Sequence, residues 1–217
     1  MINLCFHGIG TPPAGVPAEE ASYWIGVGTF RRVLDLVADR PDVRISFDDG
    51  NSSDVTVALP DLQERGLAAE FFVIAGRLED SGSLSADDVR RLRLAGMGVG
   101  SHGMHHRVWR RLGRAEQHEE LVVARRRLEE ILDEPVDTAA CPLGRYDRTT
   151  LAALRRLQYT HVYTSDRALA RAGTWRQARF SLRAHDTADD VAGWLRHGDR
   201  RTTRFADSAR TFVKGLR

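Results

Sequence analysis

The chain has 217 residues, enough for one domain with a substantial core, and its 32 basic and 30 acidic side chains give a formal net charge of +2. A hydrophobic content of 42% with 29% charged residues is typical of a folded globular protein and excludes extended disorder. The small net charge does not indicate a nucleic-acid partner, and no run approaches the roughly 20 apolar residues that span a bilayer.

The N-terminal segment Met1–Gly8 has no basic start and no long apolar run, so it predicts a first strand and not a secretory signal. Cys5 and Cys141 lie in apolar, strand-like segments, which favours two buried free thiols over a disulfide framework. Together these features predict a cytoplasmic location. They give no indication of the oligomeric state.

Short apolar runs alternate with amphipathic stretches along the chain. The expected strands are Ile2–His7, Val43–Phe47, Ala69–Ala75, Met97–Ser101, Val136–Cys141, Thr160–Thr164 and Arg179–Arg183. The expected helices are Thr29–Asp39, Asp54–Arg65, Ser85–Ala95, Glu116–Leu132, Arg148–Leu157 and Ala188–Arg196. In the clearest helix, Leu121, Leu128 and Ile131 share one apolar face. Segment Gly10–Gly28, rich in Gly, Pro and Ala, is expected to form a long loop.

Strands that alternate with helices predict parallel strands joined by right-handed crossovers. About seven such units predict a single-domain, irregular β/α barrel over residues 1–199, with a doubly wound open sheet as the alternative. Residues 200–217 are basic and are expected to form a last helix or a tail.

Functional groups of parallel β/α folds gather at the C-terminal ends of the strands. By this rule His7, Asp48, Asp49, His102 and the segment 142–144 share one rim. An isolated Asp-Asp-Gly is more often a turn. Successive side chains at a strand end nevertheless diverge, so one carboxylate can bind a cation while the other handles a proton.

His102 and His106 stand four residues apart, which brings two imidazoles together on a helical face or in a tight loop. His105 is a rival ligand at a less favourable spacing. Two histidines with one carboxylate leave positions open for water and substrate, and such a set suits Zn²⁺, Fe²⁺, Co²⁺ or Ni²⁺. The rim therefore predicts a metal site.

Three blocks in this order resemble the polysaccharide deacetylase family, also called the NodB-homology domain or carbohydrate esterase family 4. They are Ser-Phe-Asp-Asp-Gly at 46–50, His-x-x-x-His at 102–106 and Cys-Pro-Leu-Gly-Arg-Tyr-Asp at 141–147, and the resemblance extends from about His7 to Arg183. It implies a NodB-like barrel that holds a divalent metal, zinc first, with cobalt, nickel or iron as alternatives.

The resemblance also assigns roles to residues. It implies Asp49, His102 and His106 as metal ligands and Asp48 as the general base. It implies a backbone N–H donor to the oxyanion within 142–144, for which we select Leu143.

A general acid must protonate the leaving amine, and many family members supply a histidine from a late Leu-x-His block. His185 and His197 lie in polar contexts that do not match this block. His7 resembles the Tyr/Phe-His start of members whose blocks are circularly permuted, so we predict a variant whose acid histidine is N-terminal. The alternative is that His7 only ends the first strand.

Two departures from the family pattern bear on mechanism and substrate. Ala140 replaces an arginine that commonly orients the base, and Arg179 or Arg183 are candidate substitutes. Leu143 replaces an aromatic residue of the sugar site, which argues against a standard polymeric glycan. The pair Trp175-Arg176 is either a replacement platform for a sugar or ordinary packing.

We therefore expect a metal-dependent hydrolase that removes an acetyl or similarly small acyl group from an amino sugar or glycoconjugate. The predicted location favours a small, lipid-linked or nucleotide-linked sugar over a cell-wall polymer. O-acetyl esters and non-sugar amides such as ureides or formamides are close competitors. The alternative of another class is a catalytically inactive glycan-binding domain, against which the intact Asp48, Asp49, His102 and His106 argue.

Overall fold

The structure is a computed structural model, and it describes residues 1–199. Eight strands form one sheet in the order β7-β6-β5-β4-β3-β2-β1-β8, and every paired neighbour is parallel. The strands are β1 (Ile2–Phe6), β2 (Val43–Asp49), β3 (Ala69–Val73), β4 (Gly98–Ser101), β5 (Thr138–Ala140), β6 (His161–Thr164), β7 (Arg176–Ala178) and β8 (Phe180–Ser181). The predicted irregular β/α barrel is confirmed.

The barrel closes through a single segment that changes its partner. Strand β7 pairs with β6, whereas β8, one residue further along, pairs with β1 at the opposite end of the sheet. Arg179 lies between them, and its backbone N–H donates to Thr164 O at 2.9 Å. The expected strand Arg179–Arg183 is therefore only the short β8, and β7 before it was not predicted, because a segment that joins both ends of the sheet cannot keep one partner throughout.

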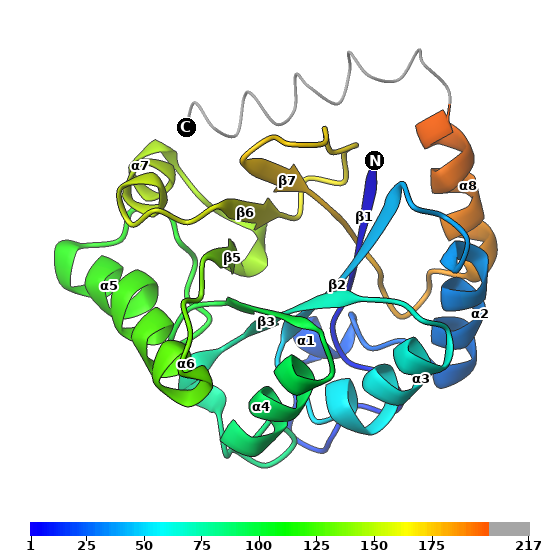
Figure 1. Cartoon of the computed structure of the whole chain (residues 1–217), viewed down its shortest axis with the longest axis horizontal. Coiled ribbons are helices and arrows are strands. Elements are labelled where there is room, and N and C mark those ends of the chain that lie inside the picture. The colour runs from blue at the N-terminus through cyan, green and yellow to red at the C-terminus, as the bar shows by residue number, and fades with distance from the viewer. Residues whose placement is uncertain (200–217) are drawn as a thin grey trace.

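Helices surround the strands on the outside of the barrel, except the short first helix, which lies near the strand ends, where its Glu20 approaches His106 (Figure 1). They are α1 (Ala18–Ala21), α2 (Val27–Val37), α3 (Leu59–Glu64), α4 (Ala86–Leu94), α5 (Arg114–His118), α6 (Ala124–Leu132), α7 (Arg148–Arg156) and α8 (Ala188–Asp199). Two π-helical segments, η1 (Asp54–Ala58) and η3 (Glu119–Val123), and two 3₁₀ turns, η2 (Ala75–Arg77) and η4 (Pro142–Gly144), complete the elements. The expected loop Gly10–Gly28 contains α1, and the expected helix Glu116–Leu132 is a helical run over 114–132.

Alternation along the strands separates the core from the barrel interior. Phe6, Phe47 and Phe71, on the first three strands, stack with ring centroids 5.3 and 4.6 Å apart, and Phe30 of α2 meets the first of them edge-on. These rings are fully buried in the layer between sheet and helices. Because neighbouring side chains of a strand point to opposite faces, Asp48 next to Phe47 points into the barrel.

Both cysteines are free and buried, as predicted. Burial raises the pKa of each thiol. Within residues 1–199, no helix is long and apolar enough to cross a membrane. The expected C-terminal helix or tail at 200–217 lies outside the described residues.

Candidate functional site

Strand β2 ends with two adjacent carboxylates, and their side chains point in different directions. Asp48 keeps the strand conformation and is 2% exposed, whereas Asp49 has φ 81° and Gly50 has φ 73°. A positive φ is uncommon outside glycine, although Asp adopts it more readily than most residues. The turn directs Asp48 toward Arg179 and Asp49 toward His106, while His102 lies near both carboxylates.

His102 and His106 come together through a tight loop after β4, and not along a helix. Their ring centroids are 5.1 Å apart, and His106 has φ 55°. His102 N–H donates to Val73 O at 2.8 Å, and Ala75 and Gly76 N–H donate to Gly103 and Met104 O at 2.9 Å each. The loop is therefore fastened along its length to the end of β3 and the turn after it.

A buried carboxylate holds the same loop from its other side. Glu120 is fully buried and accepts hydrogen bonds from the backbone N–H of Met104 at 3.0 Å and of His105 at 3.1 Å. It also accepts one from Trp109 Nε1 at 3.3 Å. Sequence reasoning missed Glu120, because it reads as one more charge on a highly charged helix.

Asp49, His102 and His106 form a compact set of potential ligands. Asp49 Oδ1 lies 3.5 Å from His102 Nε2 and 3.4 Å from His106 Nε2. One ligand atom from each residue lies within 4.8 Å of the other two. Asp49 Oδ1 is buried and has no hydrogen-bond partner among the described residues, which is an unfavourable state for a carboxylate oxygen that no cation compensates.

The two imidazoles differ in their electrostatic surroundings. Burial, together with repulsion from His106, lowers the pKa of His102 to about 4. Burial also acts to lower the pKa of His106, but the nearby carboxylates of Glu20 and Asp49 outweigh it, so that this pKa is raised. His102 Nδ1 lies 2.9 Å from Ala140 O, which makes that nitrogen the donor and turns Nε2 toward Asp49.

Arg179 grips Asp48 in the barrel interior. Its Nη1 and Nη2 donate to Asp48 Oδ1 and Oδ2 at 2.6 and 2.7 Å, and Nη1 also donates to Ser46 Oγ at 3.1 Å. Burial acts to raise the pKa of Asp48, but Arg179 and the neighbouring histidines outweigh it, so that the pKa lies well below its usual range. Two arginines were proposed to replace the one missing at Ala140, and of these Arg179 is the one that contacts Asp48.

His7 follows β1 and faces the same carboxylate. Its Nε2 lies 4.0 Å from Asp48 Oδ2, its side chain is 15% exposed, and Tyr23 packs against its ring at 4.7 Å. Arg183 lies over the ring of Tyr23, with its guanidinium carbon 5.3 Å from the ring centroid. The second candidate arginine therefore covers an aromatic ring and does not contact Asp48.

The remaining sequence candidates do not belong to the ligand set. Leu143 occupies the turn η4 with φ 55°, and its side chain is 55% exposed. His105 turns outward to Glu119, with its Nε2 3.8 Å from Glu119 Oε1. Trp175 precedes β7, at the end of the barrel away from the ligands, and donates to Tyr159 O at 2.7 Å, so packing explains it. His185 is 76% exposed beside Asp186.

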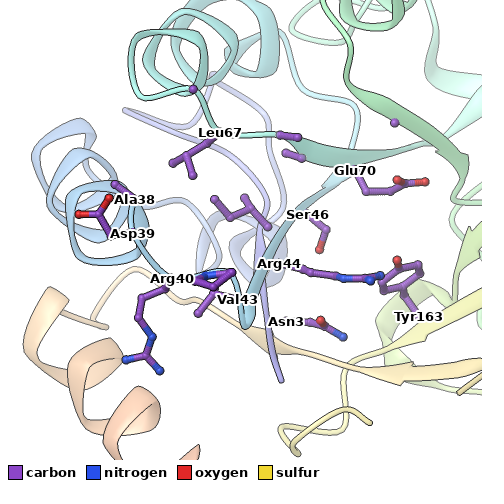
Figure 2. A pocket seen from close by; sticks show the side chains of 16 residues that line it. Asn3, Ala38, Asp39, Arg40, Val43, Arg44, Ser46, Leu67, Glu70 and Tyr163 are labelled. Atoms are coloured by element: carbon purple, nitrogen blue, oxygen red, sulfur yellow. The ribbon is translucent and has the colours of Figure 1, made fainter. Parts of the chain in front are cut away.

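A cavity of about 640 Å³ lies at the opposite end of the barrel. Its lining includes Val43, Ala69 and Gly98, the first residues of β2, β3 and β4. Figure 2 shows Arg44 extending toward Tyr163 within it. The ligand set instead follows the last residues of β2 and β4, so the chemistry predicted for the C-terminal rim is separate from this cavity.

The chain is similar to known proteins over much of its length. The profile of the polysaccharide deacetylase family matches residues 37–162, more than half of the chain. The chain is 24% identical over 124 residues to the Bacillus subtilis protein YxkH, which bears a polysaccharide deacetylase name; the match covers 57% of this chain and 44% of YxkH. The chain thus spans less than half the length of that relative.

Two solved structures share the fold. The Streptococcus pyogenes deacetylase PplD, in complex with acetate, superposes with a TM-score of 0.78 at 21% identity, covering 90% of this chain and 97% of PplD. IcaB from Ammonifex degensii gives a TM-score of 0.71 at 23% identity, covering 89% of this chain and 95% of IcaB. On the profile match, and with the barrel that these proteins share, the chain belongs to the polysaccharide deacetylase family.

Proposed function

We propose that this protein is a metal-dependent deacetylase that hydrolyses the N-acetyl, or a similarly small acyl, group of an amino sugar or glycoconjugate. One observation carries the proposal above the others. A buried carboxylate oxygen without a hydrogen bond, Asp49 Oδ1, lies between two imidazole nitrogens, and a second carboxylate, Asp48, is held beside it by an arginine.

The donor set fits a divalent cation. Two imidazole nitrogens and one carboxylate oxygen suit Zn²⁺, and Co²⁺, Ni²⁺ or Fe²⁺ accept the same ligands. Asp49, His102 and His106 would hold the ion, and their close approach gives the orphaned oxygen a partner. When bound, such an ion supplies a Lewis acid, which makes water more acidic and draws electrons from a carbonyl oxygen.

Asp48 is the candidate general base. Its lowered pKa keeps it ionised at neutral pH, and its Oδ2 lies 3.8 Å from His102 Nε2, at the edge of the ligand set. The Arg179 pair fixes the plane of the carboxylate, and each oxygen retains a lone pair after accepting one hydrogen bond. Asp48 can therefore take a proton from a water that attacks the acyl carbon.

His7 is the candidate general acid. Its Nε2 approaches Asp48 Oδ2, the oxygen that His102 Nε2 also approaches, and its side chain is partly open to solvent. The reaction balances with these two groups: the water oxygen bonds to the acyl carbon, its proton goes to Asp48, the carbon–nitrogen bond breaks, and the amine nitrogen takes a proton from His7. Acetate and the free amine leave.

The turn η4 is the candidate donor to the oxyanion. Its three residues follow β5 on the same rim, and Leu143 adopts a left-handed conformation there. A backbone N–H in this turn, that of Leu143, would stabilise negative charge on the former carbonyl oxygen. A backbone donor is unaffected by the replacement of the family's aromatic residue with Leu143.

The decisive experiment measures metal content and acetate release together. Purified protein should bind about one zinc and release acetate from N-acetylated amino sugars. Asp48→Asn should keep the metal and lose activity, whereas Asp42→Asn, at an exposed ion pair with Arg40, should behave as the wild type. Metal-free protein, or unchanged turnover in Asp48→Asn, contradicts the proposal.

The same assay distinguishes the competing functions. Release of acetate from O-acetylated but not N-acetylated sugars indicates an esterase on the same site. Glycan binding without any release indicates the inactive binding domain, against which the intact pairing of Asp48 and Arg179 argues, since a glycan binder needs no oriented base.

A further inference from the structure

The loop between β1 and α2 brings a carboxylate behind one of the candidate ligands. Glu20 lies on α1, and its Oε1 is 3.7 Å from His106 Nδ1. That nitrogen is on the opposite side of the ring from Nε2, which faces Asp49 Oδ1 at 3.4 Å. The three groups therefore stand in the order carboxylate, imidazole, carboxylate, with the ligand atom of His106 toward the centre.

Arg77 of η2 fixes Glu20 in this position. Its Nη1 and Nη2 donate to Glu20 Oε2 and Oε1 at 3.1 and 2.9 Å. The side chains of Glu20, Arg77 and His106 are 23%, 35% and 9% exposed, so solvent competes only in part for their contacts. A carboxylate held in this bidentate way has a defined direction, and one of its oxygens remains toward the imidazole.

The two histidines are supported in different ways. Behind His102 Nδ1 lies a neutral acceptor, the carbonyl oxygen of Ala140, at 2.9 Å. Behind His106 Nδ1 lies a charged one, Glu20. Each acceptor favours the proton on Nδ1 and leaves the Nε2 lone pair free to bind a cation. Ala140 O does so through a hydrogen bond, and Glu20, at 3.7 Å, does so through its negative charge.

We propose that Glu20, held by Arg77, is a positioning residue that sets the tautomer and orientation of His106 and thereby strengthens cation binding at the site. The inference rests on the proposed function in that the three ligands hold a metal. Its general basis is that carboxylates behind ligating histidines contribute about 10–100-fold to metal affinity.

The test compares two adjacent glutamates of the same helix. Glu20→Gln and Glu19→Gln remove the same charge from α1, but Glu19 is exposed and faces solvent. Zn²⁺ affinity is measured by competition with a chelator of known affinity. We expect Glu20→Gln to weaken Zn²⁺ binding by about 10-fold and Glu19→Gln to leave it nearly unchanged. Equal affinities in all three proteins, or an equal loss in both variants, overturn the proposal.

A second variant and a spectroscopic measurement separate this proposal from the first. Arg77→Met keeps the charge of Glu20 but removes its support, and we expect an intermediate loss of Zn²⁺ affinity. In metal-free protein, the ¹⁵N shifts of His106 should show a proton on Nδ1 in the wild type and a mixture of tautomers in Glu20→Gln. If the wild type binds no Zn²⁺ but the His106 tautomer still changes in Glu20→Gln, only the metal site is refuted. If the His106 spectra of wild type and Glu20→Gln are identical, the role of Glu20 is refuted.

Discussion

Arg179 and Asp48 share two hydrogen bonds, of 2.6 and 2.7 Å, in the barrel interior, where their side chains are 0% and 2% exposed. Such a pair is sensitive to the loss of either member, because the other is left as an uncompensated buried charge. The family's usual arginine is absent at Ala140, so in this chain the orientation of the candidate base depends on the segment that closes the barrel.

Replacement of Arg179 should therefore affect both stability and activity. We expect Arg179→Met to lower the free energy of unfolding by about 3–5 kcal/mol in urea titrations. Arg183→Met, four residues away and exposed, should change it by less than about 0.5 kcal/mol. In the double variant Asp48→Asn/Arg179→Met, the cost should be smaller than the sum of the single changes.

The stabilisation that the Arg179–Asp48 pair provides should depend on pH, and the direction of that dependence follows from the pKa of Asp48. The pKa of Asp48 is lower in the folded protein, so its contribution to stability is complete above the unfolded value of about 3.9 and is lost as the pH falls through the folded value. The difference in unfolding free energy between wild type and Arg179→Met should therefore become smaller in acid. A difference in unfolding free energy that stays constant as the pH falls below about 3.9 would contradict the pairing as its cause.

The role of His7 as the general acid can be tested with two substrates, only one of which has a leaving group that needs a proton. An amine must be protonated to leave, whereas a nitrophenolate leaves unprotonated. We expect His7→Gln to reduce turnover of an N-acetyl amino sugar by about 10²–10⁴-fold and to leave 4-nitrophenyl acetate hydrolysis nearly unchanged. His185→Gln, at an exposed position, serves as control. Equal losses on both substrates would assign His7 a role other than proton donation.

Zinc binding should be coupled to the release of protons. Both imidazoles must be neutral to ligate, and the pKa of His106 is raised while that of His102 is lowered to about 4. At about pH 6 most of the His106 population is protonated and His102 is neutral, so binding should displace close to one proton. Calorimetry in buffers of different ionisation enthalpy counts it. Two protons at this pH would show that the histidines titrate alike.

The turn behind the histidine loop leaves no room for a side chain. A Cβ atom at Gly76 would lie 2.2 Å from Met104 O, the backbone atom to which the Gly76 N–H donates. We expect Gly76→Ala to cost about 1–3 kcal/mol in unfolding free energy and to weaken Zn²⁺ binding, because the loop must shift. Gly28→Ala, on the exposed side of α2, should instead stabilise by up to about 1 kcal/mol.

Much of the fold could be predicted, because its determinants are local and repeated. Short apolar runs followed by amphipathic stretches predict a parallel barrel, and the rule that chemistry follows strand ends places His7, Asp48 and His102 on one rim. The chain confirms the barrel and puts these residues together. Alternation along β2 even assigns Asp48 to the interior, since its neighbour Phe47 belongs to the core.

The supporting residues could not be predicted, because their roles depend on contacts between distant segments. Glu120 is one acid among many on a charged helix until the loop after β4 folds against it. Glu20 lies in a Gly- and Pro-rich stretch without periodicity, 86 positions before its histidine. Arg179 and Arg183 were equivalent candidates, and only the register of β7 and β8 against the rest of the sheet distinguishes them.

The position of Arg179 between β7 and β8 also means that it is synthesised long after the residues it supports. The ribosome delivers the three candidate ligands by residue 106, but the countercharge of Asp48 emerges only with residue 179. A nascent or truncated chain that ends at β6 contains all three candidate ligands but not the arginine that pairs with its candidate base. If the proposed function holds, hydrolysis would require the segment that joins the two edges of the sheet, because that segment carries Arg179.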